Sequence, residues 1–305
     1  MEGSSLAACG KDDLASPQRL MDGNMDFTIY RYANGVFSPA KIPVVREIAF
    51  RILVENKELA TLMCTPLKLR ELALGFLAFE RVIDSLGDVK SLEVDENEFE
   101  AHVELNRPLP SSRPRILTSG CAGGVTFHLD VRDYAPIRAE GVLNPDAVPS
   151  LMHQLIEAAE LYHQSRGIHA AALFDGEGLI AVAEDIGRHN TLDKLRGEVL
   201  VRGIDPREHI LASSGRISSE MLRKAAQMKV PFVISRTSPT SLSIDLAKRL
   251  GITLIGYVTH DQFTVYAHPE GLASGTGSCW EGKTAWACSD ASSLNFGCTK
   301  ERSVR

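Results

Sequence analysis

Short apolar runs alternate with helical patterns through the second half of the chain, and this alternation constrains the fold most. Strand-like runs cover residues 168–174, 179–183, 209–213, 231–235, 252–258 and 263–267, and helical patterns cover 144–165, 191–201, 218–228 and 239–250. Strands that alternate with helices of this length imply βαβ crossovers, and hence a largely parallel sheet covered on both faces. The Asp-Gly-Glu-Gly turn at 175–178 is typical of a hairpin instead. We therefore expect an α/β domain over residues 141–271.

The pattern before residue 140 is different and predicts a smaller α+β domain. Apolar residues alternate from Ile48 to Val54, as expected for a half-buried strand. Further elements follow: a strand that ends near Cys64, a helix over 66–85, and strands over 89–94 and 98–105. We place this domain at 41–140. A partly mobile extension over 1–40 precedes it, and a Gly/Ser/Cys-containing tail over 272–305 ends the chain.

Composition excludes several classes of protein. The 305 residues carry a formal charge of −6, so there is no overall basic signal for nucleic acid binding. No apolar run approaches the ~20 residues of a membrane span. The first 25 residues lack the apolar region of a signal peptide. We expect a cytoplasmic protein whose cysteines are mostly reduced thiols.

One of the six cysteines has neighbours that suggest chemistry. Cys121 lies in the Gly-rich stretch 118–125, where glycine lets backbone N–H groups turn toward one point. Such surroundings lower the pKa of a thiol and favour the nucleophilic thiolate. A small buried residue in a loop is the alternative, and it is the usual fate of a free cysteine. The other five, which include three in the tail, form no C-x-x-C pair; they are Cys9, Cys64, Cys279, Cys288 and Cys298.

Polar loops follow four of the predicted strands, at 184–190, 214–219, 236–240 and 259–262. Ligands gather at the carboxyl ends of strands in such sheets, and helix N-termini bind phosphate readily. Arg188, Arg216 and Arg236 supply forked N–H donors for phosphate oxygens. Any one loop could be ordinary helix capping, but several at one edge favour a polyphosphate site. His189 shares the first loop, where the alternative is a helix-cap residue.

Known catalytic motifs are missing from the sequence. It contains neither a P-loop nor a G-x-G-x-x-G that opens a helix. His169-Ala170-Ala171 lacks the Glu of the zinc-deaminase signature, and no Cys pair follows it. We therefore predict no intrinsic metal ion.

The longer motifs resemble the FdhD/NarQ family, the formate dehydrogenase accessory sulfurtransferases. The stretches that carry the likeness are 184–194 (EDIGRHNTLDK), 213–221 (SSGRISSEM), 65–79, 167–171 and 265–266, within a similarity that covers about 43–272. The resemblance implies a cytidine-deaminase-like three-layer sandwich, with a mixed, largely parallel sheet and no zinc site. It also implies that the protein takes persulfide sulfur from a cysteine desulfurase. The sulfur then passes to the molybdenum cofactor, bis-molybdopterin guanine dinucleotide, before insertion into formate dehydrogenase.

The resemblance also implies roles for individual residues. Cys121 matches the persulfide carrier, and the residues that match the dinucleotide contacts are Tyr257, Val258, Thr259, His260, Asp261 and Gln262. Gly124 stands where many members have a second loop Cys, which excludes a dithiol relay or a thiol-disulfide oxidoreductase at this site. A cofactor chaperone without sulfur chemistry therefore stays open as the alternative. A homodimer would suit a two-armed dinucleotide.

Overall fold

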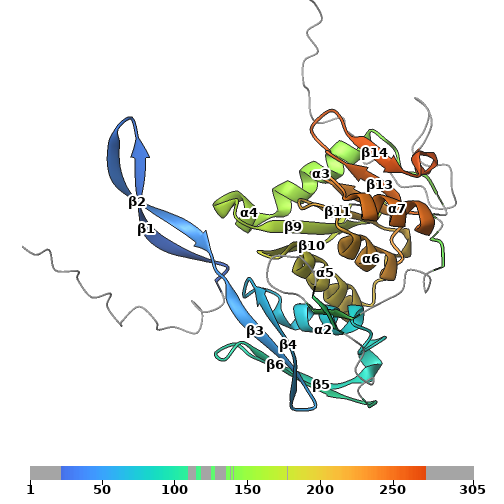
Figure 1. Cartoon of the computed structure of the whole chain (residues 1–305), viewed down its shortest axis with the longest axis horizontal. Coiled ribbons are helices and arrows are strands. Elements are labelled where there is room, and N and C mark those ends of the chain that lie inside the picture. Colours follow the sequence, from blue (N-terminus) through green and yellow to red (C-terminus); the bar gives the residue numbers. More distant parts are fainter. Residues whose placement is uncertain are drawn as a thin grey trace, which may run out of the picture.

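The computed structural model describes residues 22–108, 115–117, 125–127, 135–137, 139, 141–176 and 178–272. The described chain forms a large α/β domain, a smaller α+β domain and a projecting two-stranded arm (Figure 1). Short elements complete it: the paired strands β7 (Arg115–Leu117) and β8 (Val125–Phe127), and the 3₁₀ turns η1 (Leu86–Asp88), η3 (Pro206–Glu208) and η4 (Pro269–Gly271).

A six-stranded mixed sheet forms the centre of the large domain. Its strands, in spatial order, are β10 (Leu179–Asp185), β9 (His169–Phe174), β11 (Ile210–Ser213), β12 (Phe232–Ser235), β13 (Thr253–Gly256) and β14 (Thr264–Ala267). The mixed sheet confirms the predicted fold class, but only the β11–β12 and β12–β13 pairings are parallel. The other three pairings are antiparallel. The parallel share is smaller than predicted, because β9–β10 and β13–β14 are joined by loops too short for a crossover.

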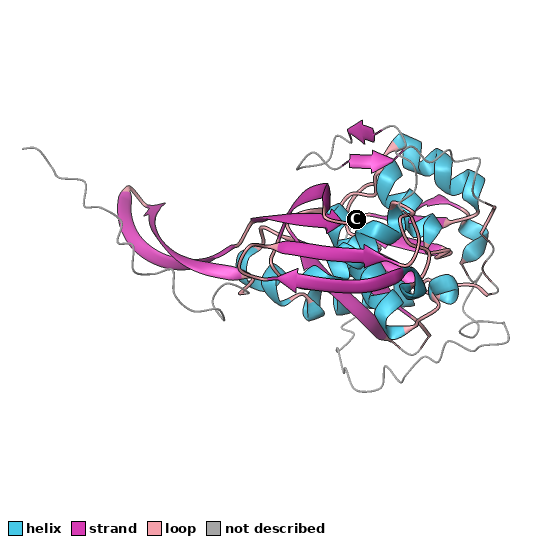
Figure 2. Ribbon diagram, turned by 90° about the horizontal axis from the view of Figure 1, so that it is seen from below, coloured by secondary structure: helices cyan, strands magenta, loops and turns pink. Residues whose placement is uncertain are grey.

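Helices cover both faces of this sheet and complete the predicted three layers (Figures 1 and 2). One face carries α5 (Arg188–Arg202), α6 (Ser219–Gln227) and α7 (Ser241–Leu250), and the other carries α3 (Ala147–Ala158) and α4 (Glu160–Ser165). Alternate strand residues serve the two cores: Ala171 and Leu173 face α5 to α7, whereas Ala170 and Ala172 face α3. The single helix predicted over 144–165 is interrupted at Ala159, whose ψ of 84° is not helical.

The small domain is a four-stranded sheet packed on one helix. Its strands are β4 (Lys57–Cys64), β3 (Ile48–Val54), β6 (Glu100–Leu105) and β5 (Val89–Asp95) in spatial order, and its helix is α2 (Leu69–Phe79). The helix is shorter than the predicted 66–85. Lys68 and Arg81 both have positive φ, 52° and 56°, and a left-handed residue cannot continue an α-helix. The strands agree with the prediction to within two residues at each end.

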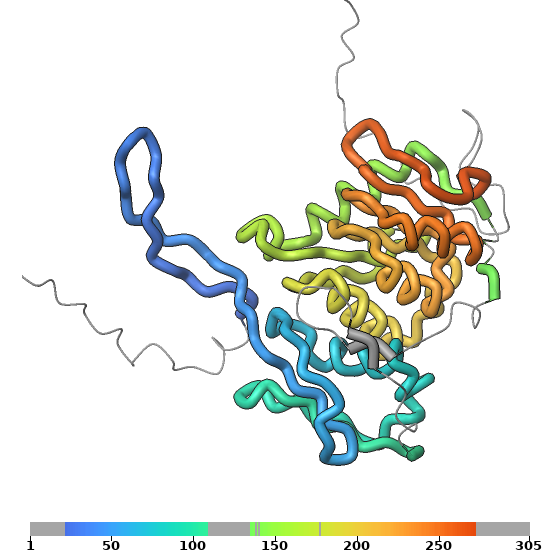
Figure 3. Tube along the Cα trace, viewed as in Figure 1, coloured from blue at the N-terminus to red at the C-terminus, as the bar shows by residue number. Residues whose placement is uncertain are grey.

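Helix α2 lies between the small sheet and α5, so it belongs to both domains (Figure 3). Two glycines make this possible. A Cβ atom on Gly75 would lie 1.7 Å from the backbone oxygen of Asp193, and one on Gly197 would lie 1.9 Å from that of Glu71. The backbones of the two helices are therefore in direct contact, and no side chain fits between them.

A long hairpin arm projects from the N-terminal end of the small domain. Strands β1 (Asn24–Ala33) and β2 (Val36–Val45) pair along their whole length around Asn34 and Gly35, whose φ values of 51° and 83° suit a type I′ turn. The exposed side chains on it include Tyr30, Tyr32 and Phe37. We expected a partly mobile extension over 1–40 and did not predict these strands. Figure 2 shows that the arm projects away from the two domains.

Candidate functional site

The carboxyl ends of four strands meet at one edge of the large sheet. Strand β10 is antiparallel to β9, which is antiparallel to β11, so β10 and β11 run in the same direction. Strands β12 and β13 continue in that direction. The four polar loops predicted from the sequence therefore do lie along one edge, which we call the carboxyl edge.

The first two loops touch each other at Gly215. A Cβ atom placed there would lie 3.2 Å from Arg188 Cβ and 3.2 Å from His169 Nδ1. Because Gly215 has no side chain, Arg188 can pack close to the loop after β11. Burial, together with the Arg188 guanidinium, lowers the pKa of His169. A neutral imidazole therefore stands beside the arginine near pH 7.

Arg188 begins α5 and is only partly buried, yet its Nε has no hydrogen-bond partner among the described residues. A buried N–H group without an acceptor is costly, and a bound oxyanion would satisfy it. Arg216 is exposed in the next loop, just before α6. Ser218 caps that helix by accepting a hydrogen bond from Met221 N at 3.3 Å.

Arg236 is held at the same edge by a residue that the sequence analysis missed. Its guanidinium donates to Tyr162 Oη at 2.8 Å, and Arg236 Cζ lies 6.0 Å from the centroid of the tyrosine ring. Tyr162 comes from α4, and Glu184 accepts hydrogen bonds from the backbone of Leu161 and Tyr162. No local pattern connects Arg236 with a residue 74 positions away, so this contact needed the structure.

His189 lies against α6, mostly buried. Its Nε2 is 3.2 Å from Ser218 Oγ and 3.6 Å from Glu220 Oε2. Burial lowers the pKa of His189 to about 4, despite the nearby Glu220. The imidazole therefore stays neutral near pH 7 and links the first turn of α5 to that of α6.

The loop after β13 is a tight, exposed turn. Tyr257 has a φ of 53°, and its backbone N–H donates to Thr237 O at 3.0 Å. Val258 is buried, and its N–H donates to Ser235 O at 3.1 Å. The four residues that follow are exposed; they are Thr259, His260, Asp261 and Gln262. The loop thus adjoins the loop of Arg236 and completes the carboxyl edge.

Several polar residues of the 184–194 stretch face inward instead. Asp185 is fully buried and pairs with Lys194 Nζ at 2.7 Å. Its carboxylate also accepts from Thr65 N and from Asn190 Nδ2. Asn190 donates further to Met63 O at 2.8 Å. These residues join the end of β4 to the large domain, so part of the dense polar motif has a structural role.

A second buried ion pair lies one residue earlier on α5. Lys224 Nζ is 2.7 and 2.8 Å from the two carboxylate oxygens of Asp193, and it lies 5.1 Å from the ring centroid of Phe79. Helices α2, α5 and α6 meet here. Neither charge could be assigned a role from the sequence, because their contact joins residues of two helices that lie 31 positions apart.

Cys121 and Gly124 lie outside the described residues, as does the tail from 273. Cys64 is the only cysteine within the described chain. It is buried, and burial raises the pKa of its thiol, so Cys64 is not a candidate nucleophile. Among the described residues, no group of three His, Cys, Asp or Glu side chains could hold a metal ion. No described helix is long and apolar enough to cross a membrane.

The architecture and the carboxyl edge define a class: a three-layer α/β protein with a small α+β domain and an arginine-bearing edge suited to anions. The FdhD/NarQ family model matches residues 45–273, and the chain belongs to that family. A sulfur carrier protein FdhD from Bacillus subtilis (strain 168) is 37% identical over 248 residues, which cover 79% of this chain and 95% of the relative. The corresponding protein from Staphylococcus haemolyticus (strain JCSC1435) is 39% identical over 249 residues, covering 80% and 94%.

A solved structure shares the fold. A chain from Desulfotalea psychrophila, assigned as a formate dehydrogenase accessory protein, superposes with a TM-score of 0.69. It is 24% identical, and the match covers 83% of this chain and all of that one. The fold class predicted from the sequence is therefore correct.

Proposed function

We propose that this chain is a sulfurtransferase that accepts persulfide sulfur on Cys121 from a cysteine desulfurase. It would pass the sulfur to the molybdenum cofactor, bis-molybdopterin guanine dinucleotide, for formate dehydrogenase. The observation that carries the proposal is the match to relatives named sulfur carrier proteins over nearly their whole length. We expect this to take place in the cytoplasm.

The carboxyl edge supports the binding of a guanine dinucleotide as substrate. Arg188 has an unsatisfied N–H, Arg216 is exposed, and Arg236 is oriented by Tyr162. Together they offer donors for several phosphate oxygens. The neutral His169 can exchange hydrogen bonds with the ligand without adding another partly desolvated cation. The exposed turn 259–262 would contact the nucleotide beside these arginines.

The thiol step needs only one cysteine. The Cys121 thiolate attacks the terminal sulfur of the donor persulfide, a new S–S bond forms, and the donor's S–S bond breaks. The donor cysteine leaves as a thiolate, so no electrons are gained or lost overall. Gly124, in the position of a second loop cysteine, is compatible with this exchange. Sulfur loading therefore tests the proposal directly.

The experiment is mass spectrometry of the full chain after incubation with a cysteine desulfurase and cysteine. We expect one added sulfur atom on Cys121, retained when the persulfide is alkylated and lost on reduction, and none in Cys121→Ser. The buried thiol provides the matched control, because Cys64→Ala should load as the wild type does. Loading confined to Cys279, Cys288 or Cys298, or no loading, would contradict the proposal.

A non-catalytic cofactor chaperone is the second candidate, favoured by the single loop cysteine. It predicts that the chain binds GDP through the carboxyl edge while Cys121→Ser still supports formate dehydrogenase in cells. Persulfide transfer predicts loss of dehydrogenase activity in that variant with unchanged GDP affinity. Analytical ultracentrifugation of the same samples would test the predicted homodimer.

A further inference from the structure

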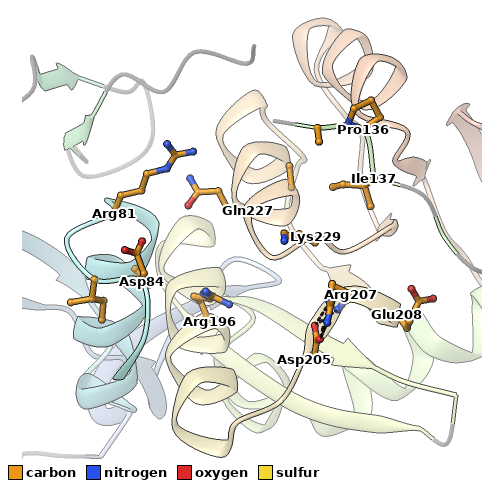
Figure 4. Close-up of a pocket in the computed structure, with 14 residues that line it drawn as sticks. Arg81, Asp84, Pro136, Ile137, Arg196, Asp205, Arg207, Glu208, Gln227 and Lys229 are labelled. Atoms are coloured by element: carbon orange, nitrogen blue, oxygen red, sulfur yellow. Dashed lines mark hydrogen bonds and ion pairs between the residues drawn. The ribbon is translucent and has the colours of Figure 1, made fainter. Parts of the chain in front are cut away.

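A cavity of about 820 Å³ lies at the opposite edge of the large sheet, where β11 and β12 begin (Figure 4). Its walls come from the residues after α2, from α5, from η3, from the end of α6 and from the segment 135–137. We call this the amino-edge cavity. Its volume is in the range of pockets that hold small-molecule ligands.

The lining of the amino-edge cavity carries an excess of positive charge. Four lining residues are basic, namely Arg81, Arg196, Arg207 and Lys229, and three are acidic, namely Asp84, Asp205 and Glu208. Two of the acids are paired, one of them with Arg207 of the same lining and the other with an arginine outside it. Asp205 pairs with the Arg207 guanidinium, with Nε 2.7 Å from Oδ2. Asp84 accepts from Arg107 Nη1 at 2.8 Å, and Arg107 does not line the cavity.

Arg196 is the group in this cavity that most needs an anion. It is partly buried on α5, and it makes no hydrogen bond or ion pair with any other described residue. Burial lowers the pKa of its guanidinium. A cation taken out of water without a partner is costly. Two residues earlier on the same helix, Lys194 is fully paired.

Positive groups on three separate elements surround the hollow in Figure 4. Arg81 follows α2, Arg196 lies on α5, and Lys229 follows α6. Lys229 is exposed and holds a left-handed φ of 59°, which ends α6 beside the cavity. Since guanidinium groups bind planar and tetrahedral oxyanions through paired N–H donors, such an arrangement is suited to phosphate.

We propose that the amino-edge cavity is an oxyanion-binding site for a phosphate-bearing ligand, with Arg196 as its principal contact and Lys229 as a second. It is separate from the carboxyl edge, because the two lie at opposite ends of the parallel strands. The proposal rests on the cavity and its unpaired arginine, not on the proposed sulfur transfer. Either can fail without the other.

Protection of arginines from phenylglyoxal, mapped by peptide mass spectrometry of the full chain, tests this site. The probe is inorganic pyrophosphate, and KCl at equal ionic strength controls for screening. We expect pyrophosphate to slow the modification of Arg196 at concentrations where KCl does not. Arg216 in the same digest reports the carboxyl edge. Protection of Arg216 alone, or equal protection by KCl, would overturn the proposal.

Calorimetry with variants supplies the second measurement. Arg196→Gln should weaken pyrophosphate binding at this site about tenfold or more, and Lys229→Gln by less. The matched control is Arg202→Gln, which removes an exposed guanidinium from the same helix. GDP affinity should be equal in all three, because GDP is assigned to the carboxyl edge. If pyrophosphate binds Arg196→Gln as it binds the wild type, the cavity is not an oxyanion site.

One further outcome concerns the chain itself. Asp130 and Asp133 precede the lining residues Ala135 to Ile137 in sequence. Suppose that the wild type bound no pyrophosphate while the double variant Asp130→Asn/Asp133→Asn bound it through Arg196. In that case a carboxylate of the chain itself would occupy the amino-edge cavity. That result would overturn the proposal of a free ligand.

Discussion

Helix α5 carries two sets of charges that differ in burial and in partners. Asp193 and Lys194 are buried and fully paired, one with Lys224 and the other with Asp185. Arg188 and Arg196 are partly buried, and neither has a complete set of partners among the described residues. The polar stretch of α5 thus contains residues that hold the domains together and residues whose N–H donors are left for the ligands proposed above. Burial and partners separate the two roles, whereas position in the stretch does not.

The largest effect is expected at the buried set. Lys194→Met leaves the Asp185 carboxylate without its counter-charge in a fully buried position. Removing one partner of a buried pair costs about 3–5 kcal/mol. Chemical denaturation should show a loss of that size in the free energy of unfolding. The double variant Asp185→Asn/Lys194→Met should recover part of this loss. A loss below about 1 kcal/mol in Lys194→Met would show that the ion pair does not stabilise the junction between the domains.

The arginines of the carboxyl edge should affect binding and not stability. We expect Arg188→Ala and Arg216→Ala each to weaken GDP binding about tenfold, because each removes a charge-assisted donor from the carboxyl edge. Arg202→Ala is the control, as a surface arginine at the other end of α5. Isothermal titration calorimetry gives the affinities. Unchanged affinity in both variants would take these two arginines out of the site.

A pH dependence tests whether His189 belongs with the buried set. Its folded pKa of about 4 lies below the ordinary value of 6.5, so the unfolded chain binds more protons between these pH values. Stability should therefore fall as the pH drops through this window, by about 1 kcal/mol between pH 7 and pH 5.5. His169 and His209 also have lowered pKa values and add to the slope. The difference between the wild type and His189→Gln in the free energy of unfolding, measured against pH, isolates this one residue. If this difference did not change with pH, His189 would not belong with the buried residues.

The smallest effect is expected at an exposed pair near the same junction. Lys68 Nζ lies 2.6 Å from Glu198 Oε2, but the lysine side chain is 39% exposed. Surface ion pairs contribute about 0–1 kcal/mol. Lys68→Met should thus shift the denaturation midpoint far less than Lys194→Met. Equal shifts would mean that burial does not determine how much these two ion pairs stabilise the fold.

The helices and strands of the large domain could be predicted because each buries one or both of its faces, and burial leaves a regular pattern of apolar residues in the sequence. Strand β11 and helix α6, for instance, show the apolar runs and spacing that burial demands. The arm could not be predicted in this way, since both faces of β1 and β2 are largely exposed and no alternation marks them. Its one local sign is the Asn34-Gly35 pair, which is typical of a tight hairpin.

The carboxyl edge was predicted loop by loop, since the ends of successive strands are visible in the sequence. The contacts that decide each role were not. Tyr162 reaches Arg236 from a distant helix, and Lys194 pairs with Asp185 only because α5 folds back along β10. Both are long-range contacts between polar residues that look like ordinary surface residues in the sequence.

The contact between Gly75 and Gly197 has a consequence for how the protein opens. With backbone against backbone, α2 cannot move away from α5 without withdrawing Phe79 from the core of the large domain and Leu200 of α5 from the core of the small domain. The buried amide protons of the four-stranded sheet and of the six-stranded sheet should therefore exchange with solvent together, in one cooperative opening of the protein. The variant Gly197→Ala places a methyl group against the backbone of α2. In this variant, hydrogen exchange should show the amides of one sheet exchanging before those of the other.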